Sequence, residues 1–109
     1  MFHMLSAFSL KDGETLAGFQ AAVDALDAHL RERDLVVETG PIGERVRHPV
    51  MDTDENNHQY YFLMSFRDRA QCDRAVALFY EREAPTDDLH LAVWKRVLDP
   101  VFTCWQDDR

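Results

Sequence analysis

Two histidines and two tyrosines are the residues of this chain whose types best suit acid–base chemistry: His3, His90, Tyr60 and Tyr61. An imidazole titrates near neutrality, so it can take a proton from a phenol or from an α-carbon. A tyrosine hydroxyl can stabilise the oxyanion that results. The competing interpretation is structural: His3 ends a strand, His90 lies on a solvated helix start, and both tyrosines fill the core.

The other histidines and the acidic residues do not show the spacing of a metal site. His3, His48, His58 and His90 can reach one ion only if the fold gathers them, because no HxH or HxxxH pair is present. The acidic run at residues 52–57 begins like a calcium loop, but Asn57 stands where such a loop needs glycine. We therefore expect no metal ligands.

Nucleophilic and cofactor chemistry are poorly supported. Cys72 and Cys104 form no CxxC pair, and we expect two reduced, buried thiols. The chain has no GxSxG nucleophile elbow and no glycine-rich phosphate loop that opens a helix. The sequence therefore predicts no cofactor. Trp94 and Trp105, with Phe102, can line an aromatic pocket or pack in the core.

Composition limits the partners of the protein. The formal net charge of −8 leaves no basic surplus for nucleic acid or an anionic membrane. No run approaches the roughly 20 apolar residues that span a bilayer. The first residues carry no basic segment of the kind that opens a signal peptide. We expect a single domain over residues 1–109, located in the cytoplasm, with no nucleic-acid or membrane partner.

The most apolar stretch is residues 59–66, which alternate as a strand. Tyr60, Phe62, Met64 and Phe66 share one side, and Tyr61, Leu63 and Ser65 share the other. Other strands are expected at residues 2–10, at 35–47 with a bend or bulge at 40–43, and at 101–106. A first helix is expected at residues 14–33, with a cap at Asp12 or Gly13. A second helix is expected to begin after Asp68, which forms a capping-box pattern with Gln71. A third, short helix is expected at residues 87–98, before a break at Asp99 and Pro100.

This order predicts an α+β, ferredoxin-like β-α-β-β-α-β subunit with a four-stranded antiparallel sheet. Helices then cover one face of the sheet. The opposite face keeps apolar side chains, and a large apolar sheet face marks an interaction surface. A symmetric homodimer through this face is the commonest way to cover it.

Four stretches resemble the dimeric α/β-barrel superfamily: the opening FHMLSAFSL strand, the helix containing Phe19 and Leu26, the run SFRDRAQCDRA and the closing DPVFTCWQD strand. The pattern is most similar to a bacterial branch. The resemblance implies two sheets packed face to face and a small-molecule pocket between sheet and helices. The superfamily includes cofactor-free monooxygenases, isomerases, haem-handling enzymes and polyketide-type cyclases.

The resemblance also implies site residues. Stress-responsive and cyclase-like members carry a histidine in the first strand, an aromatic residue or histidine early in the third, and a histidine ahead of the short helix. On this chain the matching catalytic candidates are His3, Tyr60 and His90. Tyr61, Trp94 and Trp105 are the candidates for contact with a ligand.

The resulting hypothesis is a small-molecule-binding protein, either a cofactor-free monooxygenase-like or a cyclase- or isomerase-like enzyme for a small apolar or aromatic metabolite. The alternative is a non-catalytic ligand-sensing or assembly module. A cavity lined by His3, Tyr60 or Tyr61, and His90 favours the enzyme. An interior filled by Phe, Met and Trp side chains favours the module.

Overall fold

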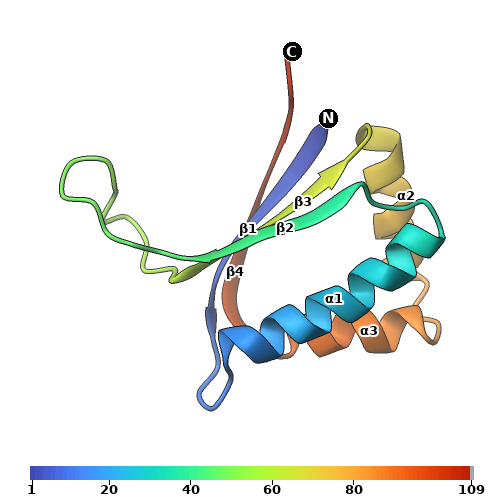
Figure 1. Cartoon of the computed structure of the whole chain (residues 1–109), viewed down its shortest axis with the longest axis horizontal. Coiled ribbons are helices and arrows are strands. Elements are labelled where there is room, and N and C mark those ends of the chain that lie inside the picture. The colour runs from blue at the N-terminus through green and yellow to red at the C-terminus, as the bar shows by residue number, and fades with distance from the viewer. Residues whose placement is uncertain (109) are drawn as a thin grey trace.

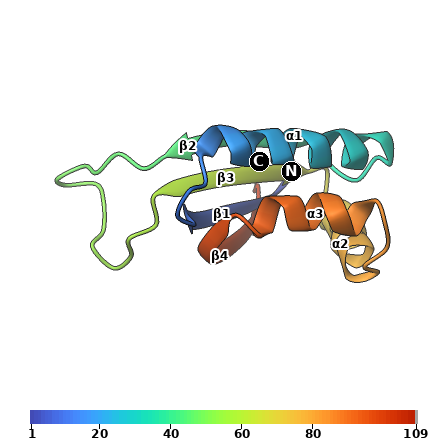
Figure 2. The same ribbon diagram turned by 90° about the horizontal axis from the view of Figure 1, so that it is seen from below.

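The computed structural model describes residues 1–108 and has four strands and three helices. In chain order they are β1 (Phe2–Leu10), α1 (Leu16–Glu32), β2 (Glu38–Glu44), β3 (Tyr60–Phe66), α2 (Arg69–Tyr80), α3 (Thr86–Trp94) and β4 (Val97–Gln106). The strands form one antiparallel sheet in the order β2-β3-β1-β4, and the helices lie on one side of it (Figures 1 and 2). The predicted α+β ferredoxin-like fold is confirmed, with α3 as the additional helix.

The core lies between the sheet and the helices, and α1 contributes more buried side chains to it than α2 or α3. Alternation along the two central strands places Phe8 and Phe62 on the face that α1 covers, where both are buried. Phe19 of α1 reaches them, with ring centroids 4.6 Å from Phe8 and 5.8 Å from Phe62. These contacts fix α1 along the sheet, and the remainder of the helix side is left to α2 and α3.

Side-chain caps set where the two longer helices begin. The Asp68 carboxylate accepts the backbone N–H of Gln71 at 2.8 Å, which confirms the predicted start of α2. The first helix begins later than expected, because Thr15 caps it and accepts the backbone N–H of Gly18 at 3.0 Å. The prediction of a cap at Asp12 or Gly13 was therefore wrong. Thr15 is three residues before Gly18, the same spacing as between Asp68 and Gln71, so both side chains cap their helices in the same way.

The edge strands differ from the expectation. β2 begins at Glu38, while Leu35 and Val36 precede it and are buried. The predicted irregularity at residues 40–43 is confirmed, because the pairing with β3 shifts between Thr39 and Ile42. Burial of the 35–36 pair, and not strand pairing, explains the apolar run that suggested an earlier start.

β4 runs through Asp99 and Pro100, which were expected to break the chain before the last strand. Asp99 has a φ of 52°, and the pairing of β1 with β4 shifts between Ala7 and Ser9. A β-bulge absorbs the extra residue and lets both halves pair with β1. The expected helix over 87–98 is consequently shorter and ends at Trp94.

The face of the sheet opposite the helices is open. Cross-strand partners on it include Leu5 with Leu63 and Ala7 with Tyr61. Val101 and Trp105 of β4 are 51% and 41% exposed. In the part of the chain that the structure describes, no helix covers this face, and no helix is long and apolar enough to cross a membrane.

Candidate functional site

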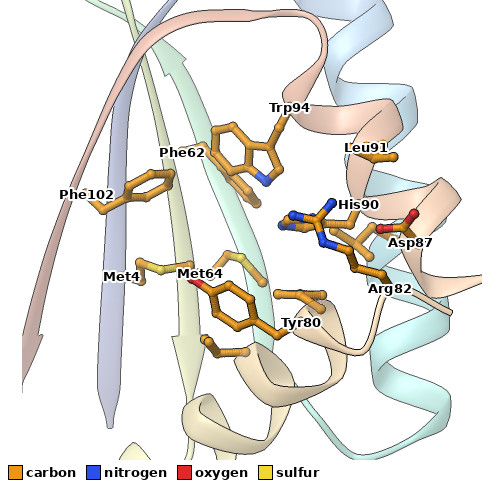
Figure 3. A pocket seen from close by; sticks show the side chains of 13 residues that line it. Met4, Phe62, Met64, Tyr80, Arg82, Asp87, His90, Leu91, Trp94 and Phe102 are labelled. Carbon is orange, nitrogen blue, oxygen red and sulfur yellow. The ribbon is translucent and has the colours of Figure 1, made fainter.

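An apolar pocket of about 340 Å³ opens between the helix-covered face of the sheet and helices α2 and α3 (Figure 3). Its volume is within the range of small-molecule sites, roughly 300–1,000 Å³. Side chains of the sheet form one wall: Met4, Phe62, Met64 and Phe102. Side chains of the helices form the other: Leu26, Val76, Phe79, Leu91 and Trp94. Four polar or charged residues join the lining: Tyr80, Arg82, Asp87 and His90.

Simple periodicities explain how these residues meet. Met4 pairs with Met64 in adjacent strands, and Phe62 lies two residues before Met64, so all three point to the helix side. His90 and Trp94 are four residues apart on α3, and such residues lie on one face of a helix. The pocket therefore lies where these strand side chains face the inward sides of the helices.

His90 is the titratable histidine of this pocket. Its ring stacks on Phe79, with centroids 4.2 Å apart and planes 15° from parallel. Burial lowers the pKa of His90, the nearby Asp87 carboxylate opposes this shift, and the Arg82 charge adds a smaller lowering of the pKa. The imidazole is therefore neutral near pH 7, with one nitrogen able to accept a proton and the other able to donate a hydrogen bond.

Only some of the residues proposed from the sequence lie at this pocket. His90 and Trp94 line it. Tyr60 is on the same side of the sheet but packs against Phe8, with ring centroids 5.9 Å apart, and is absent from the lining. The expected grouping of His3, Tyr60 and His90 in one cavity is not formed within the chain.

His3, Tyr61 and Trp105 lie on the open face, on the far side of the sheet from the pocket. His3 pairs across the strands with both Ser65 and Trp105, and its ring centroid is 4.9 Å from that of Trp105. The reason is the two-residue period of a strand: His3 immediately precedes Met4, so the two side chains point to opposite faces.

His3 belongs to a hydrogen-bonded chain on that open face. Its Nε2 lies 2.9 Å from Asp107 Oδ2, and its Nδ1 lies 2.8 Å from Ser65 Oγ. Because an ionised carboxylate only accepts, the ring donates Nε2–H to Asp107. The same hydrogen bond lowers the pKa of Asp107. The chain of contacts ties the end of β4 to the centre of the sheet.

The thiols and the other histidines do not form a site. Cys72 is buried, but Cys104 is exposed on the edge strand β4, so the expectation of two buried thiols was wrong for Cys104. His58 donates from Nε2 to the carbonyl of Asp99 at 2.8 Å, beside the bulge. Over residues 1–108, no three His, Cys, Asp or Glu side chains are grouped as a metal site requires.

Arg82 is a pocket residue that sequence reasoning missed. It follows α2 in a turn, where no periodicity indicates which way its side chain points. The apolar lining was more accessible to prediction, since the alternation of Phe62 and Met64 already placed them on one face. A charged residue in a turn carries no comparable signal.

No protein-family model matches the chain, and no curated protein matches its sequence. Solved structures do match its fold. A protein of Arabidopsis thaliana is 10% identical with a TM-score of 0.71, and the match covers 100% of this chain and 97% of that one. A dimeric ferredoxin-like protein of unknown function from Jannaschia is 14% identical with a TM-score of 0.66, covering 97% and 98%.

A third match is the hydroxynitrile lyase from Passiflora edulis, 10% identical with a TM-score of 0.65, covering 99% of this chain and 94% of that one. These identities are low, so the matches bear on the fold alone. They agree with the ferredoxin-like fold that the sequence predicts. This chain has the fold of the dimeric ferredoxin-like proteins.

Proposed function

We propose that this protein binds a small apolar or aromatic metabolite in the pocket between the sheet and helices α2 and α3. The observation that carries the proposal is the pocket itself, whose apolar walls enclose one partly buried histidine, His90. Apolar walls with a few polar groups are typical of small-molecule sites. Trp94, with Phe62 and Phe79, gives the walls the flat aromatic surfaces that suit an aromatic ligand.

The proposed chemistry is proton transfer at His90 without a cofactor. A neutral imidazole in an apolar site can remove an acidic proton from a bound substrate, which is the step that a cyclase- or isomerase-like or a cofactor-free monooxygenase-like reaction requires. One solved structure with this fold is a hydroxynitrile lyase, so the fold can support an enzyme. His3 is a second candidate only if another molecule completes a site on the open face.

The second candidate function is a non-catalytic ligand-sensing or assembly module. It is favoured because His3, Tyr60 and Tyr61, the other acid–base candidates from the sequence, do not line the pocket with His90. His90→Gln distinguishes the two functions once a substrate is known. An enzyme loses turnover while it still binds ligand, whereas a module shows binding and no turnover in either form.

We also propose that the protein is a homodimer through its open sheet face. Apolar side chains on that face include Leu5, Leu63 and Val101. Several structures with this fold are described as dimeric ferredoxin-like proteins. Two copies packed through this face remove the apolar side chains of both from water, which stabilises the assembly.

Pocket binding is tested with naphthalene-2-acetamide, an uncharged aromatic probe, by isothermal titration calorimetry. Val76→Phe adds a ring inside the pocket and is expected to weaken binding at least about tenfold, because it occupies the volume of the ligand. Ala77→Phe adds the same ring on the exposed side of α2 and leaves binding unchanged. Equal binding by both variants, or no binding by the parent protein, contradicts the proposal.

A further inference from the structure

We propose that the ligand of this pocket is a monocarboxylate, with its apolar or aromatic body between the sheet and α3 and its carboxylate at Arg82. This inference rests on the function proposed above and specifies the chemical class of the ligand. The structure assigns Arg82 as the anion-binding residue and His90 as the neutral donor beside it.

The position of Arg82 directs its side chain to the mouth of the pocket. Arg82 lies two residues past the end of α2, with a φ of 53°, and its backbone N–H donates to the carbonyl of Phe79 at 3.4 Å. From this turn its guanidinium extends over the pocket toward His90 (Figure 3). The depressing effect of Arg82 on the pKa of His90 agrees with this proximity.

The guanidinium of Arg82 has no partner among the described residues. Arg45, Arg67 and Arg96 each pair with an acidic side chain, whereas no hydrogen bond or ion pair involves the Arg82 side chain in residues 1–108. A guanidinium presents paired N–H donors that match a carboxylate, and the match strengthens beside an apolar surface. An arginine on the lining of an apolar pocket is therefore available to an anionic ligand.

The charge of the ligand follows from the other groups at the mouth. Among the described residues Arg82 is the only cation of the lining and His90 is neutral, so one anionic group can pair there, while the charge of Asp87 disfavours a second negative charge on the ligand. Asp87 lies in the first turn of α3, where the helix dipole stabilises a carboxylate. A monocarboxylate thus fits better than a phosphate. A cationic ligand paired with Asp87 is the competing outcome.

Calorimetric titration compares three probes with one ring system: naphthalene-2-acetate, naphthalene-2-acetamide and 2-(naphthalen-2-yl)ethylamine. The acetate is expected to bind the parent protein at least about tenfold more tightly than the acetamide. Arg82→Gln should remove this preference and leave the affinity for the acetamide unchanged, and Arg82→Lys should keep part of it. Arg74→Gln, an equal loss of charge at an exposed position of α2, should keep all of it.

The outcomes separate this inference from the proposed function. Equal affinity for acetate and acetamide, tighter binding of the amine, or a preference that survives Arg82→Gln overturns the carboxylate assignment and leaves pocket binding intact. No binding of any probe at millimolar concentration overturns both. Circular dichroism and the thermal midpoint of each variant show whether it is folded, and Arg82→Lys provides the comparison if Arg82→Gln is not.

Discussion

Arg45 shows how much of a connection one buried, fully hydrogen-bonded side chain can organise. Its guanidinium bonds both oxygens of Asp52, at 3.0 and 2.7 Å, and also Asn56 Oδ1 at 2.7 Å and the carbonyl of Thr53 at 2.7 Å. Its side chain is only 6% exposed. One arginine thus holds together the long connection between β2 and β3, which extends away from the helices (Figure 1).

Asp52 is expected to titrate far below an ordinary aspartate. The hydrogen bond from Arg45 lowers the pKa of Asp52 from 3.8 to about 2, with a smaller contribution from the backbone N–H of Thr53. Because the pKa in the folded state is depressed, the stabilisation is complete above pH 3.8 and is lost as the pH falls through 2. Carbon-13 NMR of the carboxyl groups measures this titration directly.

Arg45→Gln should return the Asp52 pKa toward 3.8, because it removes the largest cause of the shift. Arg47→Gln should change it much less, since Arg47 contributes least among the causes. A value near 3.8 in the parent protein would show that the Arg45–Asp52 pair is not formed in solution.

Helix starts and strand irregularities give the elements their positions relative to the site. The cap at Asp68 fixes where α2 begins, and α2 in turn carries Val76 and Phe79 into the pocket. The bulge in β4 has a similar effect, because it lets one strand continue past Pro100 and bring Phe102 to the pocket wall. The cap and the bulge are both local features, yet each determines which side chains reach the pocket.

Asp68→Ala is expected to lower the free energy of unfolding by about 1 kcal/mol, because the backbone N–H of Gln71 loses its side-chain acceptor. Urea denaturation followed by circular dichroism measures the change. Asp73→Ala, an exposed substitution on the same helix, should change stability by less than about 0.5 kcal/mol. Equal losses in both variants would argue that the cap does not stabilise α2.

The molecule as a whole has two unlike sheet faces. Three helices cover one, and within residues 1–108 no helix covers the other, which has the His3–Asp107 pair beside its strand side chains. The polar chain from Ser65 to Asp107 lies among apolar neighbours such as Leu5. In a homodimer through this face, the hydrogen bonds from Ser65 to Asp107 in both subunits are removed from water. Their defined geometry favours one relative position of the two sheets over others.

Leu63→Arg should convert the proposed dimer into a monomer, because it introduces a charge at the centre of the apolar face without a partner. Size-exclusion chromatography with light scattering gives the mass directly. Ala21→Arg, on the exposed side of α1, is the matched control and should remain dimeric. A parent protein that is monomeric at micromolar concentration, or a dimeric Leu63→Arg variant, contradicts the assembly.

Local patterns were sufficient for most of the fold. The alternation in residues 59–66, the apolar stripe of the first helix and the Asp68 cap predicted β3, α1 and the start of α2, since these features depend on side-chain periodicity and on hydrogen bonds within a few residues. The same patterns gave the open apolar face. They failed at Asp99 and Pro100, because whether a bend ends a strand depends on the partner strand that accepts the bulge.

The site depended on contacts that no local pattern contains. Residue types identified His90 and Trp94, but only the folded sheet places His3 on the far face, one position along the strand from Met4 in the pocket wall. Arg82 lacks any sequence signal because a turn has no period. The sequence thus specifies the elements through local energetics, whereas the pocket arises from long-range packing between sheet and helices, which chooses the side chains that meet.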